Sequence, residues 1–81
     1  MPTDTVRITR VHSMATKNPH ITQHFVEGYD QRGLTQQYQT ANDWRGSFCK
    51  RHELNPVWVT VVWKDSRFGK EIVGVGEAQT A

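Results

Sequence analysis

The sequence has little of what usually identifies a function. It holds one cysteine among 81 residues, so an internal disulfide and a four-cysteine zinc site are both excluded. No apolar run approaches the roughly 18 residues that a membrane-spanning helix needs, and the first residues lack the apolar core of a signal peptide. Repeats and low-complexity tracts are absent as well. A lone thiol is typical of a reducing compartment, so we expect a cytoplasmic protein with no membrane partner.

Catalytic motifs are equally scarce. Ser13, Ser47 and Ser66 lie in no nucleophile motif, and the sequence has no glycine-rich phosphate-binding loop. None of the 8 acidic residues is singled out as half of a catalytic pair. A domain of this length with one helix also has little room for a cleft. We therefore predict that the protein is not an enzyme and uses no cofactor.

Two pairs of residues could suggest a metal site. Cys49 and His52 fall on one face of a predicted helix, but zinc would need two more ligands. His20 and His24 have a spacing that converges on a helix, whereas Pro19 and the residues that follow favour a strand. Four residues of strand span roughly 13 Å, too far for one metal ion. We predict no metal site, and a small buried thiol beside a histidine at the end of a helix.

What the sequence does contain is enough for one small globular domain. Hydrophobic residues make up 36% and charged residues 22% of the chain, and its net charge is +2. A chain of this size buries roughly 60–65% of its unfolded surface, so its core is thin. We predict a single domain over residues 1–81, with loose ends at 1–4 and 78–81 and a loop at 12–19.

Alternation of apolar and polar residues predicts five strands separated by turn signals. The predicted strands are 5–11, 20–30, 34–41, 57–63 and 71–78. Gly33 suits the turn between the second and third strands, because glycine adopts positive φ at little cost. Met14 is an alternative first residue, and a chain that began there would lose the first strand.

Residues 42–54 form the predicted helix. Asn42 or Asp43 can cap its start, and Pro56 stops it because proline disfavours a helical residue before it. Apolar residues recur on one side at roughly four-residue spacing, and we expect these residues to be buried, Trp44 and Phe48 above all. The predicted buried stripe comprises Trp44, Phe48, His52 and Leu54.

The order of these elements is β-β-β-α-β-β. It predicts an α+β fold, a single antiparallel sheet with one helix packed on one face. One helix can cover only one face of a sheet. Trp58 and Val62 would lie on the uncovered face as an apolar patch, and such patches commonly mark association. We therefore predict that a partner, or a second copy in a homodimer, binds this face.

Basic residues form two groups, one on the helix and one around the last hairpin, where Phe68 lies at the tip. An aromatic ring among basic residues can stack on a base or insert into a pocket of a partner. The plain alternative is a solvated charged face. The predicted partner-binding residues are Trp58, Val62, Arg67 and Phe68. The residues predicted for direct nucleic-acid binding are Arg45, Lys50, Arg51, Lys64, Arg67 and Lys70.

The stretch HFVEGYDQRGLTQQYQTANDWRGSFCKRHELNPVWVTVVWKDSRFGKEIVGV resembles small phage-encoded inhibitors in element order and size. Some type I anti-CRISPR proteins and some phage inhibitors of host RNA polymerase have this arrangement. The resemblance implies a non-enzymatic protein that sterically blocks a host defence or nucleic-acid-processing complex, in the cytoplasm of the host cell. The sequence therefore supports two hypotheses. The first is this inhibitor, whose partner is a host protein or nucleoprotein complex, and the alternative is a small basic domain that binds nucleic acid directly.

Overall fold

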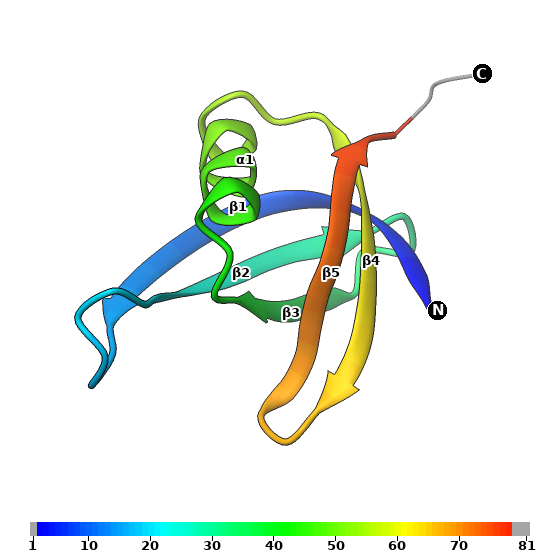
Figure 1. Ribbon diagram of the computed structural model, residues 1–81. Helices are drawn as coiled ribbons and strands as arrows, with labels where there is room; N and C mark the ends of the chain where they lie inside the picture. Colours follow the sequence, from blue (N-terminus) through cyan, green and yellow to red (C-terminus); the bar gives the residue numbers. More distant parts are fainter. Residues whose placement is uncertain (1, 79–81) are drawn as a thin grey trace.

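The structure is a computed structural model, and it describes residues 2–78. Five strands and one helix follow one another along the chain in the predicted order (Figure 1). The elements are β1 (Thr3–Ala15), β2 (Thr22–Asp30), β3 (Thr35–Thr40), α1 (Asp43–Leu54), β4 (Trp58–Ser66) and β5 (Gly69–Glu77). The strands close into a barrel in the order β1-β2-β3-β5-β4. The prediction of one antiparallel sheet with a helix on one face is therefore wrong.

Closure depends on β1, which pairs along both of its edges. Its first residues, Thr3–Arg7, pair with β4, and the stretch from Val6 to Ala15 pairs with β2, both antiparallel. A register shift between Ile8 and Arg10 marks a bulge, and a bulge bends a strand and increases its twist. The predicted loop at 12–19 is wrong over residues 12–15, which belong to β1, and the predicted loose end at 1–4 is wrong for Thr3 and Asp4, which pair with β4. Residues 79–81 of the predicted C-terminal end lie outside the described residues.

The other seam of the barrel is short. Strands β3 and β5 run parallel, and their register joins Gln39 to Glu71. Side chains strengthen this seam, since Lys70 Nζ donates a hydrogen bond to Gln36 Oε1 at 2.6 Å. The Tyr38 hydroxyl of β3 also donates a hydrogen bond to the carboxylate of Asp4 on β1, which lies 4.0 Å from Lys70 Nζ of β5. Five strands thus form a closed wall, with β3 and β5 as its least extensive contact.

The inside of the barrel is filled by small, mostly β-branched side chains. Successive residues of a strand point to opposite faces, so alternate positions of each strand lie inside. The buried hydrophobic residues of the strands are Val6, Ile8, Val11, Val26, Tyr38, Val59, Val61 and Ile72. Because the sheet closes on itself, its two faces are the inside and the outside of the barrel. The predicted uncovered face of an open sheet does not exist.

Trp58 and Val62, which were assigned to that face, lie on the outside of β4 and are half-buried. The guanidinium of Arg7 lies 5.0 Å from the centre of the Trp58 ring. The ring of Tyr29 meets Trp58 edge-on at 6.1 Å. Trp58 is thus packed among its neighbours on β1 and β2.

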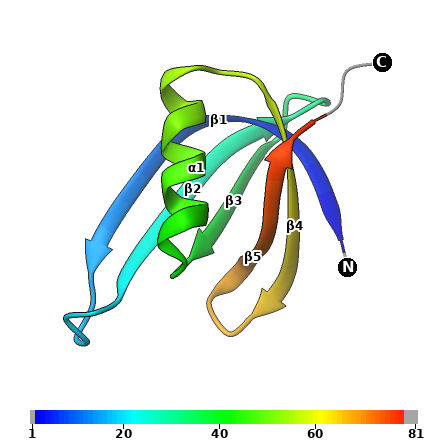
Figure 2. The same ribbon diagram turned by 45° about the horizontal axis from the view of Figure 1, so that its top comes forward.

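Helix α1 packs mainly against β1 (Figure 2). Its buried residues are Gly46, Cys49 and His52. Gly46 lies so close to the ring of His24 that an added Cβ would be 2.5 Å from it. Small residues therefore line this helix–barrel contact. In residues 2–78 the helix, with 12 residues, is too short and too polar to cross a membrane.

The predicted buried stripe of α1 is correct for His52 and wrong for Trp44 and Leu54. Trp44 is 64% exposed and Leu54 is 72% exposed. Phe48 is half-buried, packs against the edge of the core and stacks on Trp44 with 5.7 Å between ring centres. The close approach of α1 to the barrel leaves no room for the large aromatic side chains between them.

Glu53 joins α1 to β1. Its Oε2 accepts a hydrogen bond from the backbone N–H of Val11 at 2.9 Å and lies 3.0 Å from Lys50 Nζ. The hydrogen bond from Lys50 lowers the pKa of Glu53, the Val11 N–H lowers it further, and both outweigh the opposing effect of burial. The folded state therefore favours the ionised form of this carboxyl group.

We expect Glu53→Gln to lower the free energy of unfolding by about 1 kcal/mol at neutral pH, because a charged hydrogen bond becomes a neutral one. Since the pKa of Glu53 is lowered on folding, its contribution is complete above the unfolded value of 4.5 and is lost as the pH falls through the folded value. Urea unfolding of both proteins across this range measures the difference. Glu27→Gln is the matched control, and an equal loss in both variants at neutral pH would contradict the role of Glu53.

Candidate functional site

Two hairpins extend from the barrel on either side of a hollow. One is the β1–β2 arm, which we define as residues 12–24, and the other is the β4–β5 tip, residues 66–69 (Figures 1 and 2). The hollow between them has a volume of about 620 Å³. Gln23 and Phe25 of β2 line one side of it, Gln39 of β3 lies between, and the tip contributes Arg67 and Phe68.

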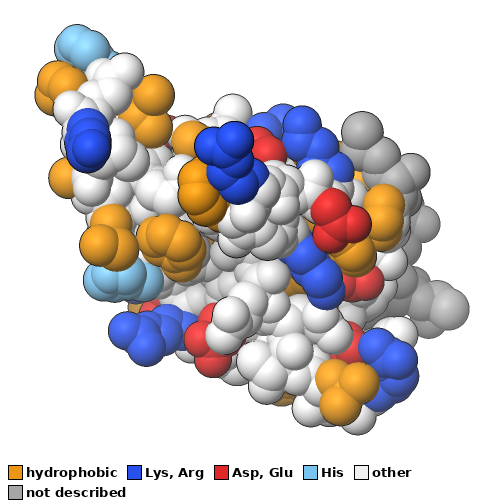
Figure 3. Space-filling view, turned by 90° about the horizontal axis from the view of Figure 1, so that it is seen from below, with side chains coloured by type: hydrophobic (Ala, Val, Ile, Leu, Met, Phe, Trp, Pro, Cys, Tyr) orange, Lys and Arg blue, Asp and Glu red, His pale blue; other side chains and the backbone are white. Residues whose placement is uncertain are grey.

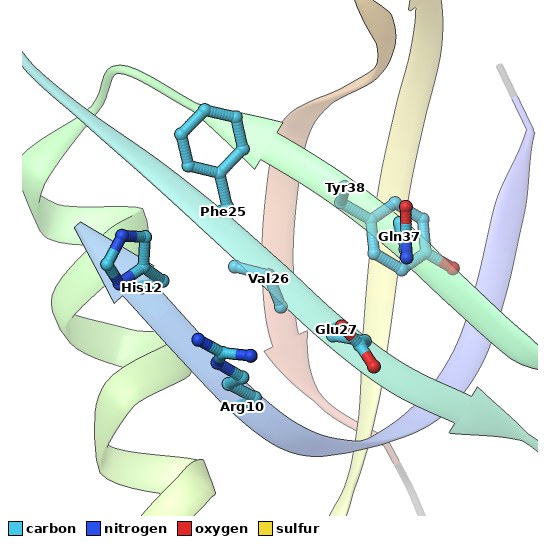
Figure 4. A pocket seen from close by; sticks show the side chains of 7 residues that line it. All are labelled: Arg10, His12, Phe25, Val26, Glu27, Gln37 and Tyr38. Carbon is cyan, nitrogen blue, oxygen red and sulfur yellow. The ribbon is translucent and has the colours of Figure 1, made fainter. Parts of the chain in front are cut away.

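Phe25 lies at the centre of this surface. It points outward from β2, and its side chain is 40% exposed. Its neighbours across the strands are His12 on β1 and Gln39 on β3. Phe25 also lines two smaller hollows, one of which lies beside Arg10 and Gln37 and has a volume of about 280 Å³ (Figure 4). The outer face of β1–β3 is thus indented around a single aromatic ring.

Phe68 provides a second aromatic ring at the β4–β5 tip, where it is 80% exposed. Ser66 orders the turn beneath it. The Ser66 hydroxyl donates a hydrogen bond to the carbonyl of Gly69 at 2.8 Å and accepts one from the backbone N–H of Phe68 at 3.3 Å. Gly69 has a φ of 119°, which a residue with a side chain rarely adopts. The turn therefore holds Phe68 away from the core.

Exposed basic side chains lie on both hairpins that flank the large hollow. Arg10, His12 and Lys17 come from the first hairpin, and Arg67 comes from the β4–β5 tip. Figure 3 shows basic and apolar side chains together over the end of the molecule that holds the β1–β2 arm. Carboxylates are present at the edges of the hollows, where Glu27 and Glu71 contribute to the lining. The surface combines aromatic rings, separated cations and a few acceptors.

Polar side chains line part of the large hollow, and we call Gln23, Gln39 and Glu71 together its floor. Gln23 Nε2 donates to Gln39 Oε1 at 3.4 Å, and Gln39 Nε2 donates to Ser66 Oγ at 3.4 Å. Glu71 lies directly across the parallel seam from Gln39. Its carboxylate is 4.0 Å from Lys64 Nζ, at the limit of an ion pair. Two amides and one carboxylate thus line the same hollow as the aromatic rings.

Of the predicted partner-binding residues, the structure brings Arg67 and Phe68 into the hollow. Trp58 and Val62 do not line it. Val62 lies on the outside of β4 opposite Thr3 of β1. The predicted partner surface therefore splits in two, and its hairpin half belongs to the site.

The predicted nucleic-acid-binding residues do not form one surface either. Arg45, Lys50 and Arg51 lie on α1 and line none of the three hollows, and Lys50 is paired with Glu53. Lys70 is close to Phe68, but its Nζ lies 4.5 Å from the centre of the Trp63 ring and 4.0 Å from Asp4 Oδ2. Arg67 is the exposed member of this set that lines the main hollow.

Sequence reasoning missed Phe25, Arg10 and His12. The alternation in residues 20–30 does place Ile21, Phe25 and Tyr29 on one side of the strand. This side is outside the barrel, and all three side chains are exposed. The signal was present in the sequence, but alternation alone does not tell which side of this strand lies outside the barrel.

One histidine of the arm, His24, joins two other side chains. His24 Nδ1 hydrogen-bonds to Ser13 Oγ at 2.7 Å, and its Nε2 hydrogen-bonds to Asp43 Oδ1 at 3.0 Å. This chain joins β1, β2 and the start of α1, so it holds the arm against the helix. Cys49 is buried, and burial raises the pKa of its thiol to about 12. Within residues 2–78, no cluster of three potential ligands could hold a metal ion.

No family model matches this chain, and neither a curated protein nor a solved structure matches it significantly.

Proposed function

We propose that this protein binds single-stranded nucleic acid in the hollow between the β1–β2 arm and the β4–β5 tip. The observation that carries the proposal is the pair of exposed rings, Phe25 and Phe68, that line the same hollow. Aromatic side chains stack on unpaired bases of any sequence, and a positively charged groove follows the backbone of the strand. Arg67 lines this hollow, Arg10 lines the smaller hollow beside Phe25, and Lys17 is exposed in the loop of the arm, so that each can supply a cation.

The strand order supports the same surface. A five-stranded barrel in the order β1-β2-β3-β5-β4, with a helix between β3 and β4, has the topology of the OB-fold. Barrels of this topology bind oligonucleotides on the face of their second and third strands and with the loops after their first and fourth strands. The hollow lies at this face and these two loops. Topology alone does not define a function, and the side chains of the hollow are what supports nucleic-acid binding.

The exposed rings favour a single strand over a duplex. In a duplex, neighbouring base pairs stack on one another and cover the faces of the bases, so Phe25 and Phe68 cannot reach these faces. An unpaired strand offers these faces directly, and its bases can lie against aromatic side chains. We therefore expect a labelled single strand of about 12 nucleotides to bind more tightly than a duplex of the same length.

Binding should weaken as salt is added. Arg10, Lys17 and Arg67 are three exposed cations that can each pair with a phosphate. Each phosphate contact on a single strand adds about −0.7 to the slope of log affinity against log salt, so we expect a slope of about −2. Fluorescence anisotropy at several salt concentrations measures it. An affinity that does not change with salt would contradict the proposal.

A matched pair of variants locates the contact. Arg67→Ala should weaken binding and make the salt slope less negative by about 0.7, because one phosphate contact is lost. Arg51→Ala removes the same charge from the exposed side of α1 and should leave both quantities close to those of the unaltered protein. Equal effects of the two substitutions would show that binding depends on the net charge of the protein and not on a contact in the hollow.

The hypothesis of a steric inhibitor stays a prediction, and the exposed tip with Arg67 and Phe68 suits a protein interface as well. Aromatic and arginine side chains contribute much of the binding energy in such interfaces. A pull-down with tagged protein, with and without nuclease, separates the two proposals. A discrete partner that survives nuclease would support the inhibitor, and recovery of nuclease-sensitive material would support direct nucleic-acid binding.

A further inference from the structure

The main hollow has aromatic walls and a hydrogen-bonding floor. Rings stack on the faces of bases, so a base held by Phe25 or Phe68 presents its polar edge to whatever lies beside the ring. In this hollow the floor contains the amides of Gln23 and Gln39 and the carboxylate of Glu71. The chemistry of this floor determines which base edges fit.

The charge of Glu71 determines which part of a bound nucleic-acid strand faces the floor of the hollow. Its side chain is 43% exposed, and its ion pair with Lys64 is long at 4.0 Å. A carboxylate accepts hydrogen bonds and repels phosphate. The phosphates are therefore expected near Arg10, Lys17 and Arg67, which leaves the base edges to meet Gln39 and Glu71.

The amides are free to change partners. Gln39 accepts from Gln23 and donates to Ser66, each at 3.4 Å, whereas well-formed protein hydrogen bonds of this kind measure 2.7–3.2 Å. Exchanging such long bonds for bonds to a base costs little. Gln39 then offers one N–H donor beside the acceptor oxygens of Glu71, with which it is in register.

We infer that the hollow prefers bases whose Watson–Crick edge carries an exocyclic amino group beside a ring-nitrogen acceptor, which are cytosine and adenine, over uracil and thymine. The amino group donates to Glu71, and the ring nitrogen accepts from Gln39 Nε2. Uracil and thymine place a carbonyl oxygen where the amino group would be, and this oxygen faces the carboxylate. The inference rests on the proposed function and assigns Gln39 and Glu71 as the residues that determine specificity.

Two oligonucleotides test this preference directly. Oligo(dC) and oligo(dU) of about 12 nucleotides have the same backbone and ring size, and they differ at ring positions 3 and 4. We expect the unaltered protein to bind oligo(dC) at least about fivefold more tightly, which corresponds to the lower end of the discrimination given by one good base contact. Oligo(dA) should bind more tightly than oligo(dT) for the same reason.

Glu71→Gln tests the mechanism as well as the preference. Its amide can donate to the carbonyl oxygen of uracil, so oligo(dU) should bind more tightly and the ratio should fall to about twofold or less. Gln39→Ala should also reduce the ratio, through weaker binding of oligo(dC). Asp65→Asn removes a carboxylate from an exposed position near the tip and is the control for net charge, with an unchanged ratio.

The outcomes are distinguishable. Binding that depends on salt and on Phe25 and Phe68, but is equal for oligo(dC) and oligo(dU), would overturn this inference and leave the proposed function in place. A ratio that Glu71→Gln leaves unchanged, in a protein whose circular dichroism shows it folded, would overturn the role of Glu71. The absence of binding to any of the four oligonucleotides would overturn the proposed function, and the inference with it.

Discussion

Replacement of Phe25 and Phe68 together by alanine is expected to weaken the binding of a single-stranded oligonucleotide by at least about thirtyfold. Stacking of a base on an aromatic side chain contributes about 1–3 kcal/mol, and two lost rings amount to about 2 kcal/mol or more. Since neither ring belongs to the buried core, with Phe25 40% and Phe68 80% exposed, the fold should tolerate the change. Anisotropy titration at one fixed salt concentration gives the affinities.

Trp44→Ala is the matched control for this loss. Trp44 is also aromatic and 64% exposed, but it lies on α1, where it stacks on Phe48 and lines none of the three hollows. We expect its removal to change the affinity by less than about twofold, since no base reaches it. If the double variant bound as tightly as the Trp44 variant, we would conclude that the nucleic-acid strand does not lie in the hollow.

Gly28→Ala is expected to produce the largest loss of stability of any single substitution considered, about 3 kcal/mol of unfolding free energy. A Cβ at this position would lie 2.4 Å from the backbone carbonyl oxygen of Arg7 on the neighbouring strand. Rotation of a side chain cannot relieve that overlap, so β1 and β2 would have to separate at the bulge. This loss is a large share of the roughly 4–12 kcal/mol by which a domain of this size is stabilised.

Gly76→Ala provides the comparison on β5. A Cβ there would have no atom within 4 Å. Alanine also reduces the conformational freedom of the unfolded chain, so we expect this variant to be neutral or slightly more stable. Urea unfolding of the two variants measures the difference. Similar midpoints for both would show that β1 and β2 are not held as closely as the structure places them.

The number of strands, their order and the place of the helix follow from local patterns that can be read in the sequence. Closure of the barrel does not, because it depends on pairing between residues far apart in the chain. One local sign of the bend in β1 was available. Val6 and Ile8 share a face, whereas Val11 falls on the opposite phase, and this change of phase is the bulge.

The errors about side chains have related causes. Spacing along the helix favoured the large residues Trp44 and Phe48, but a helix that approaches a barrel closely needs Gly46 and Cys49 at the contact. On the β4–β5 hairpin, an exposed turn could be recognised directly, so the exposed position of Arg67 and Phe68 at its tip was predicted correctly. Phe25 was missed because the outward face of β2 is defined only once the barrel has closed.

The parallel seam at Gln39 and Glu71 is both the least extensive pairing in the barrel wall and the floor of the hollow. A nucleic-acid strand held between the arm and the tip would therefore cross the β3–β5 seam, where the barrel wall opens most readily. Anything that binds only the closed form shifts the folding equilibrium in its favour. Occupancy of the hollow and integrity of the barrel are thus thermodynamically linked: a loaded molecule resists unfolding, and a change that loosens the seam weakens binding without touching the ligand.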